Sequence, residues 1–415
     1  MTKPVYFKNW ITDWQWALRI ALFLILLSSL MQFGMFSLTQ NYMIAYLGAQ
    51  PEDISFALLL TYAGIISILP IQFRFLRYFE MRTYLLTNII LAILINCLCV
   101  NCQDINMFFV FRFLQGILVG NTAACALILI FTRLRSECAQ AIGSAVFYGA
   151  ILANTVLIGL VGAIVVNSAD WKVTYYYLMG FQVLTVVIIL LSFRSSSGHK
   201  PHPLYQIDWA GFIVFSCAAI AFAYTMIYGS KYYWFADKRI LLSASITFSC
   251  VSLFIYRQSI IKRPLIHIKA FKYPNFIIGL CLLAIYYGSK DSINLVYNYV
   301  GGVLKWSTLQ IISLALCNIA GMVGTLIIST QLTLAKRHST KRFLVMGFLI
   351  MAGYNAWIYF TMTPDLSFMD LLFPVILQGV ASGLLFVPII IFTISSLPTE
   401  TGTTGLVVAA YARFT

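Results

Sequence analysis

Long apolar runs follow one another along almost the whole chain, and this pattern limits the possible folds more than any other feature. A membrane-spanning helix needs about 20 predominantly apolar residues. Runs of this kind lie near 17–41, 54–72, 83–101, 107–131, 140–166, 173–193, 209–229, 240–257, 274–297, 309–331, 343–362 and 370–396. A thirteenth run begins near Thr403 and reaches the last residue, Thr415. The pattern predicts an all-α polytopic membrane protein.

Composition and charge agree with this prediction. The chain is 61% hydrophobic and 10% charged, whereas soluble domains carry about 25% charged residues. The net charge of +14 does not indicate a nucleic-acid partner, because Lys and Arg occupy short gaps between the apolar runs. With a cytoplasmic N-terminus, the inner segments hold 18 Lys and Arg and the outer loops hold 5. The positive-inside rule therefore predicts a multi-pass protein whose N-terminus is cytoplasmic.

The longest polar break, RSSSGHKPHPLYQ at 194–206, divides the predicted helices into groups. It predicts a cytoplasmic linker over 194–207 that follows a six-helix N-terminal half over 1–193. Two additional helices are expected over 208–262, and a second half over 263–415.

An internal repeat supports two related halves. The heptad LQGILVG (114–120) recurs as LQGVASG (377–383), 263 residues later. Each copy carries a small-xxx-small pattern, and we expect its glycines to allow close helix contacts: Gly116, Gly120, Gly379 and Gly383. The same offset maps Thr415 onto Leu152, inside the fifth run. We therefore expect the last one to two helices of the second half to be missing from this chain.

Arg112 is the most unusual residue of the first copy, because it is a permanent cation inside an apolar run. A charge near the middle of a bilayer costs about 2.5–3.5 kcal/mol on insertion scales, so Arg112 must face a partner or water. Gln115 lies three residues later, on the same helical face. The repeat maps Arg112 onto Val375, so the cation is not duplicated. Arg112 either serves transport or ties helices together through backbone carbonyls.

Lys290 and Asp291 are two neighbouring charged residues within the ninth run. Burial in an apolar environment disfavours the charged carboxylate, so Asp291 could carry a proton near neutral pH. Asp291 is also the first candidate for a functional partner of Arg112. The alternative is a pair at the outer membrane interface whose side chains reach water.

Three amides are further candidates for polar positions in a transport cavity: Asn154, Asn318 and Gln378. Hydrogen bonds between helices are an equally good explanation for such residues. The sequence contains no Walker A pattern, HExxH or GxSxG, and the cluster of Cys97, Cys99 and Cys102 is only weak evidence for a metal site. We therefore expect no catalytic residues, no metal site and no cofactor.

Five segments in chain order resemble the major facilitator superfamily, in particular its fourteen-span drug:proton antiporters. RFLQG (112–116) is similar to the RxxQG motif of their fourth helix, and DWKVTYYY (170–177) to the segment entering their sixth. YQIDWAGFI (205–213) resembles the entry to their seventh helix, and RPLIHIKAFKYPNF (263–276) the segment before their ninth. QGVASGLLFVP (378–388) resembles their twelfth helix.

The resemblance implies a major facilitator fold in the inner membrane, with proton-coupled efflux of amphipathic small molecules by alternating access. It implies membrane lipid, protons and a small-molecule substrate as partners, and it allows a periplasmic adaptor protein. The chain departs from the family in FRFLRYFEMR (73–82), where Phe73 and Arg77 replace the usual Gly and Asp, and in ANTVLIGLVGA (153–163), which lacks Pro. The acid common in the first helix of drug exporters is absent from 31–41, and His267 replaces a usual acid.

Two alternatives to proton-coupled efflux follow. One is an uncoupled facilitator or importer of the same fold, which the missing first-helix acid favours. The other is a polytopic membrane enzyme or a structural partner, which would need a catalytic cluster or a soluble domain.

Overall fold

The protein is described by a computed structural model that covers residues 6–133, 150, 154, 157–158, 161, 170–195, 207–334, 340–398 and 402–411. Within this part of the chain, 11 helices are long and apolar enough to cross a membrane. The only β-type pairing among these residues is an isolated bridge between Phe7 and Phe193. The predicted all-α polytopic fold is confirmed. The predicted run near 140–166 lies mostly outside the described residues.

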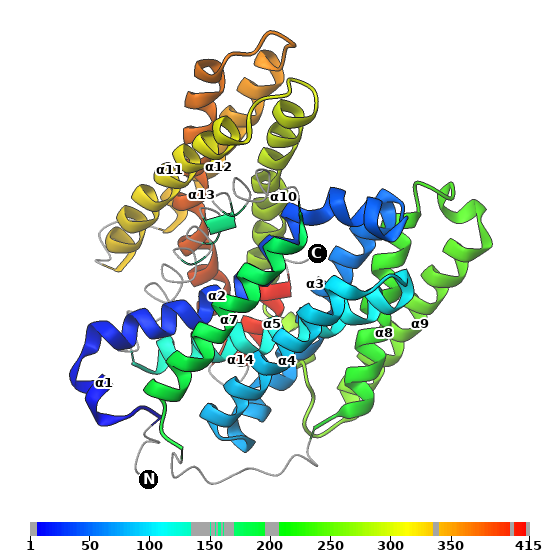
Figure 1. Cartoon of the computed structure of the whole chain (residues 1–415), viewed down its shortest axis with the longest axis vertical. Helices are drawn as coiled ribbons and strands as arrows, with labels where there is room; N and C mark the ends of the chain where they lie inside the picture. Colours follow the sequence, from blue (N-terminus) through cyan, green and yellow to red (C-terminus); the bar gives the residue numbers. More distant parts are fainter. Residues whose placement is uncertain are drawn as a thin grey trace. The chain divides into compact units, whose positions relative to one another are not determined.

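The helices follow the apolar runs closely, and several extend a few residues beyond them (Figure 1). Their bounds are α1 Asn9–Asp13, α2 Gln15–Leu47, α3 Pro51–Tyr78, α4 Met81–Asn101, α5 Ile105–Arg133, α7 Lys172–Ser192, α8 Trp209–Tyr228, α9 Lys238–Ile260, α10 Pro274–Gly302, α11 Thr308–Leu334, α12 Thr340–Thr361, α13 Phe368–Ser395 and α14 Gly402–Tyr411. Two short 3₁₀ helices are η2 Trp234–Ala236 and η3 Ile268–Lys272.

Local sequence explains where one helix ends and the next begins. Gly48 ends α2 in a left-handed conformation with φ of 59°, which glycine adopts without the steric cost of a Cβ atom. Pro51 then occupies the first turn of α3, where its missing N–H costs nothing. The Asp53 carboxylate accepts a hydrogen bond from the backbone N–H of Gln50 at 2.9 Å. These contacts place the α2–α3 turn within four residues.

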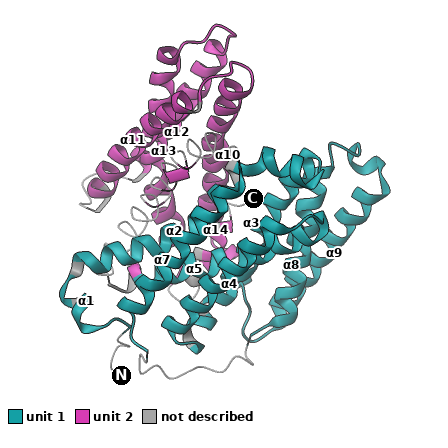
Figure 2. Cartoon of the chain, viewed as in Figure 1, with its two compact units in different colours: residues 1–129, 168–268 teal, residues 130–167, 269–415 magenta. Residues whose placement is uncertain are grey.

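The described helices form two compact units (Figure 2). In the first unit, α7 packs against α2 and α4, while α8 packs against α3 and α9. In the second unit, α13 contacts α10, α11, α12 and α14. Helices α8 and α9 lie within 208–262 and belong to the first unit; that they are additions between two six-helix halves stays a prediction.

Both units contain the same close crossing of two helices at glycines. In the first unit, a Cβ on Gly116 of α5 would overlap the Thr61 carbonyl oxygen of α3. In the second unit, a Cβ on Gly379 of α13 would overlap the Asn318 carbonyl oxygen of α11. One turn later, a Cβ on Gly383 would overlap the Met322 carbonyl oxygen, and a Cβ on Gly120 would meet the Ile68 side chain. The small residues of the repeated heptad thus lie where helix backbones approach each other.

The partner helices show the same repeat. The residues of α11 at the crossing lie 257 positions after those of α3 at the equivalent crossing. The matched pairs are Thr61 and Asn318, Gly64 and Gly321, Ile65 and Met322, and Ile68 and Thr325. The α3–α5 pair and the α11–α13 pair are therefore built from equivalent positions.

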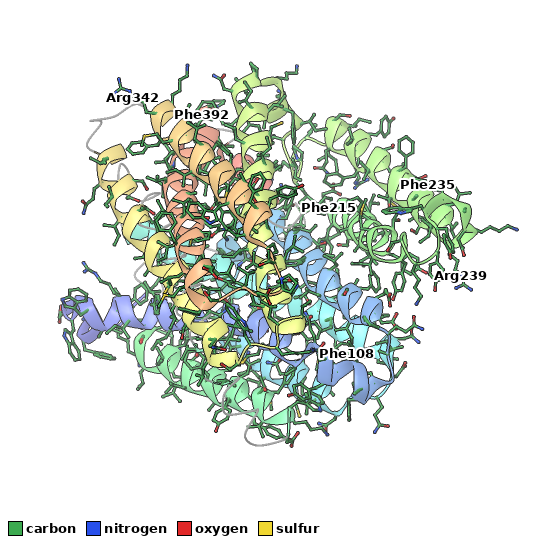
Figure 3. All side chains as sticks on the ribbon, turned by 90° about the horizontal axis from the view of Figure 1, so that it is seen from above. Phe108, Phe215, Phe235, Arg239, Arg342 and Phe392 are labelled. Carbon is green, nitrogen blue, oxygen red and sulfur yellow. The ribbon has the colours of Figure 1, made fainter. Side chains whose placement is uncertain are left out.

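The α8–α9 hairpin is attached to α3 at both of its ends. At the turn end, the Tyr228 hydroxyl donates a hydrogen bond to Asp53 at 2.5 Å. Phe235 and Arg239 also lie at this end (Figure 3). At the other end, the Arg74 guanidinium of α3 donates to the carbonyl oxygens of Arg263 at 3.1 Å and Pro264 at 3.4 Å. Hydrogen bonds thus anchor both ends of the hairpin to the first unit.

A carboxylate organises the end of the hairpin opposite the turn. Asp208 caps α8 by accepting a hydrogen bond from the Gly211 N–H at 2.9 Å. It also pairs with the Nε of Arg257 at 2.8 Å and accepts from Gln258 at 2.9 Å. The side-chain amide oxygen (Oε1) of Gln258 then accepts a hydrogen bond from the backbone N–H of Leu265 at 2.6 Å. One carboxylate and one amide therefore hold α8, α9 and the segment after α9 together.

We expect Asp208→Asn to remove a pH-dependent part of the stability. Burial alone would raise the pKa of Asp208, but its hydrogen bonds and the charge of Arg257 outweigh burial and lower the pKa below its usual value. A lowered pKa in the folded state stabilises the protein above about pH 4, the unfolded value, and this stabilisation is lost as the pH falls. Thermal melts in detergent should therefore show a steeper fall in Tm below pH 5 for the wild type than for Asp208→Asn.

Asp237→Asn is the matched control for this measurement. Asp237 caps α9 at the turn end and accepts a hydrogen bond from the Arg239 N–H at 2.7 Å. Since Asp237 forms no ion pair in the described part of the chain, its loss should leave the slope of Tm against pH as in the wild type. Equal slopes for Asp208→Asn and the wild type would contradict the assigned role.

Candidate functional site

Arg112 lies on α5, and its side chain is completely buried in the first unit. Its guanidinium Nη1 donates a hydrogen bond to the side-chain amide oxygen (Oε1) of Gln115, three residues later on the same helix. The guanidinium carbon also lies 3.7 Å from the centre of the Phe36 ring of α2, which is a cation–π geometry. Arg112 therefore contacts an amide and an aromatic face.

A chain of amides extends from Arg112 across three helices. Gln115 donates a hydrogen bond to Asn96 of α4 at 2.7 Å. Asn96 in turn donates to Gln182 of α7 at 2.9 Å. All three side chains are buried. The network links α5, α4 and α7 through uncharged groups, so it orients the arginine without neutralising it.

The hydrogen-bonding capacity of Arg112 is incompletely used. Among the described residues, neither Nε nor Nη2 of Arg112 has a hydrogen-bond partner, and no carboxylate there lies within ion-pair distance. A buried cation with unused donors is energetically costly in a membrane, which favours a functional role over a packing role. Such a group can hold water or an anion.

A second polar cluster lies in the first unit, at the ends of α3 and α4. Gln72 donates to the carbonyl oxygen of Asn121 at 3.1 Å and accepts from the Tyr84 hydroxyl at 3.1 Å. Asn121 donates to Asn88 at 3.0 Å. These hydrogen bonds connect α3, α4 and α5, although the side-chain oxygen of Asn121 has no partner among the described residues.

The second unit uses its amides differently. Asn318 of α11 donates to Gln378 of α13 at 2.6 Å and to the Val375 carbonyl oxygen at 2.7 Å. Gln378 donates to the Lys290 carbonyl oxygen of α10 at 2.9 Å. Gln378 is the repeat counterpart of Gln115, and each glutamine joins neighbouring helices. At Val375, the counterpart of Arg112, only the backbone carbonyl contributes to this network.

Asp291 lies within α10 and its side chain is exposed, whereas Tyr286 and Ile293 of the same helix are buried. Asp291 therefore points away from the packed face of its own unit, and the apolar burial expected for it is not found among the described residues. Lys290 is half-buried. Arg112 belongs to the first unit and the Lys290–Asp291 pair to the second. Asn154, the remaining amide named from the sequence, is buried.

Asn96, Gln182 and Phe36 take part in the Arg112 site but were not identified from the sequence. Gln182 is the single amide of α7, and Asn96 is one of three asparagines of α4; an amide inside an apolar helix is the same signal that drew attention to Asn154 and Asn318. Applied to every run, that signal would have found both amides. Phe36 is one of 32 phenylalanines, so its ring contact with Arg112 had no comparable signal.

No metal site is found in the described ranges, where no group of three His, Cys, Asp or Glu could hold an ion.

The family model of the Major Facilitator Superfamily matches residues 22–414. Among curated proteins, Multidrug resistance protein 3 of Bacillus subtilis is 22% identical over 343 residues, covering 74% of this chain and 64% of the relative. Multidrug export protein EmrB of Escherichia coli is 21% identical over 326 residues, covering 77% of this chain and 62% of the relative. The chain thus spans less than two thirds of the length of these relatives.

Solved structures support the same fold. A POT family transporter in complex with 5-aminolevulinic acid has a TM-score of 0.66 at 14% identity, covering 95% of this chain and 87% of that one. The proton:xylose symporter XylE has a TM-score of 0.61 at 13% identity, covering 97% of this chain and 86% of that one. The Major Facilitator Superfamily, whose family model matches this chain, comprises transporters rather than enzymes. The protein is an integral, multi-pass membrane protein that belongs to the major facilitator superfamily.

Proposed function

We propose that the protein is a secondary active transporter that exports amphipathic small molecules in exchange for protons by alternating access. The observation that carries this proposal is the buried Arg112, whose guanidinium has two nitrogens without partners in the described part of the chain. A site that is only structural would be expected to satisfy its buried charge. The names of the multidrug relatives support an amphipathic substrate.

In this mechanism, Arg112 and Asp291 have separate tasks. Asp291 is an acid within a spanning helix that can bind and release a proton. Arg112 holds water or an anionic group beside the Gln115–Asn96–Gln182 chain, which fixes the orientation of its guanidinium. Gly116 and Gly379, with Gly120 and Gly383, keep the paired helices of each unit in contact while the protein changes conformation.

In this proposal the protein lies in the inner membrane with a cytoplasmic N-terminus. The 18 to 5 distribution of Lys and Arg supports the orientation of the N-terminus. A periplasmic adaptor protein is the partner to test. Pull-down of a purified adaptor by the full-length protein measures that association, and no enrichment over an unrelated transporter would exclude it.

Asp291→Asn should abolish transport driven by a pH gradient, because the amide cannot exchange a proton. Proteoliposomes with an imposed gradient and a fluorescent amphipathic substrate provide the measurement. Asp365→Asn, which changes an exposed acid in the loop before α13, is the control and should transport normally. Undiminished gradient-driven flux in Asp291→Asn would remove the coupling assignment.

An uncoupled facilitator or importer is the second candidate. The observation in its favour is that α2 contains no Asp or Glu between Gln15 and Leu47. Wild-type flux that is the same with and without the pH gradient would select this candidate, and flux that follows the gradient would exclude it.

A further inference from the structure

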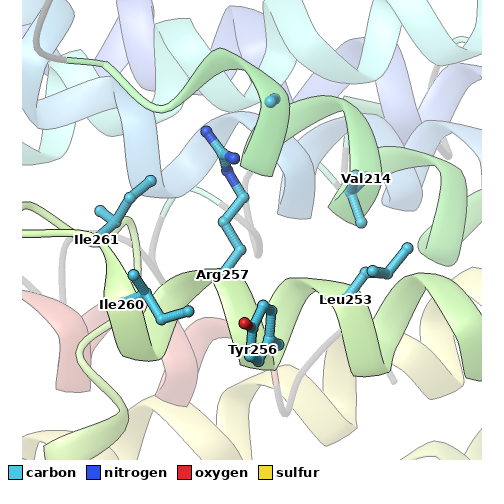
Figure 4. A pocket seen from close by; sticks show the side chains of 7 residues that line it. Val214, Leu253, Tyr256, Arg257, Ile260 and Ile261 are labelled. Atoms are coloured by element: carbon cyan, nitrogen blue, oxygen red, sulfur yellow. The ribbon is translucent and has the colours of Figure 1, made fainter.

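A groove lies between α8 and α9, at the end of the hairpin that Asp208 organises (Figure 4). Its volume is about 370 Å³. Aliphatic side chains, one tyrosine and one cation line it: Ala210, Val214, Leu253, Ile260, Ile261, Tyr256 and Arg257. In Figure 4 the Arg257 side chain rises from α9 between the two helices. The groove is therefore apolar along its length and has a single positive charge.

Only one of the guanidinium nitrogens of Arg257 is paired within the described part of the chain. Its Nε pairs with Asp208 at 2.8 Å, and its side chain is 42% exposed. Asp208 also accepts hydrogen bonds from Gly211 and Gln258, so its charge is shared among three donors. Within the described residues, neither terminal nitrogen of Arg257 has a partner. Arginine with free terminal nitrogens matches the oxygens of a phosphate group, which it can bind with two hydrogen bonds.

The surroundings add positive charge and apolar surface. Lys262 and Arg263 follow shortly after α9 and are exposed, so three cations lie within the seven residues 257–263. The exposed Trp209 at the start of α8 marks the depth at which aromatic residues meet lipid headgroups. Arg257 lies one turn from the end of α9, at a comparable depth.

We propose that this groove binds one anionic phospholipid, with its phosphate on Arg257 and an acyl chain between α8 and α9. Charge complementarity selects this occupant, because the polar end of the groove is cationic and the rest is apolar. An exposed groove on membrane-spanning helices also faces hydrocarbon chains. The proposal does not depend on the transported substrate or on proton coupling.

Native mass spectrometry of the delipidated full chain, titrated with phosphatidylglycerol or phosphatidylcholine, tests this site. The wild type should bind phosphatidylglycerol about tenfold more tightly than phosphatidylcholine, the effect of one charge-assisted contact. Arg257→Gln should lose that preference. Leu253→Trp, which fills the groove and keeps the Arg257–Asp208 pair, should weaken binding of both lipids.

Arg239→Gln is the matched control, since it removes an exposed arginine from the other end of the same helix. It should retain the preference for phosphatidylglycerol. A folded Arg257→Gln protein with the wild-type preference would overturn the proposal, as would unchanged lipid binding by Leu253→Trp. Competition by inorganic phosphate as effective as that by phosphatidylglycerol would also overturn it, because it would indicate a phosphate site without a lipid chain.

Discussion

Arg112→Met should leave the protein folded and reduce gradient-driven transport by about a hundredfold, the order of effect of losing one positioned donor that stabilises charge. Methionine fills a similar volume without charge. It removes a buried cation that has unused donors in the described part of the chain. Replacing buried charges by apolar side chains is often neutral or stabilising. We therefore expect an unchanged or higher Tm together with the loss of transport.

Two measurements on the same preparation separate a functional from a structural Arg112. Thermal melts in detergent give the Tm, and proteoliposomes with a pH gradient give the flux per folded protein. Arg19→Met is the matched control, because it makes the same chemical change at an exposed position of α2. A lower Tm with normal flux for Arg112→Met would mean that Arg112 only ties helices together.

Gly379→Leu and Gly116→Leu should each reduce the yield of monodisperse protein more than about tenfold, because the cost approaches the whole stability of a typical protein. At both positions, even a Cβ atom would overlap a backbone carbonyl oxygen of the neighbouring helix. Backbones cannot yield as side chains do, so the helix pair would have to separate.

Glycines without close neighbours provide the controls. At Gly180 of α7 and Gly353 of α12, an added Cβ atom would meet nothing within 4 Å. Gly180→Leu and Gly353→Leu should therefore give yields near the wild type, as judged by size-exclusion chromatography. Wild-type yield from Gly379→Leu would contradict the close crossing of α11 and α13.

The positions of the helices could be predicted from the sequence because hydrophobic length is a local property. Each described spanning helix coincides with an apolar run, and Gly48 and Pro51 mark one turn directly. The spacing of Arg112 and Gln115 was sufficient to predict one helical face, and the two side chains form a hydrogen bond. The repeat of LQGILVG also predicted glycines at equivalent positions.

The partners of these residues depended on how helices pack. Asn96 and Gln182 are 86 positions apart, and no local pattern indicates that their amides meet. The attachment of α8 and α9 to α3 likewise depends on contacts between residues such as Asp53 and Tyr228, 175 positions apart. The assignment of Asp291 to proton coupling stays a prediction.

The sequence by itself determined that the chain crosses a membrane many times, where most helices lie, and which cation stands inside them. Apolar length and charge are properties of short segments, and a bilayer acts on each segment separately. Only the tertiary structure decided that Arg112 contacts Phe36 and a chain of three amides. Those contacts require four helices to pack at particular positions, and side-chain shape and hydrogen bonding across helices select that packing.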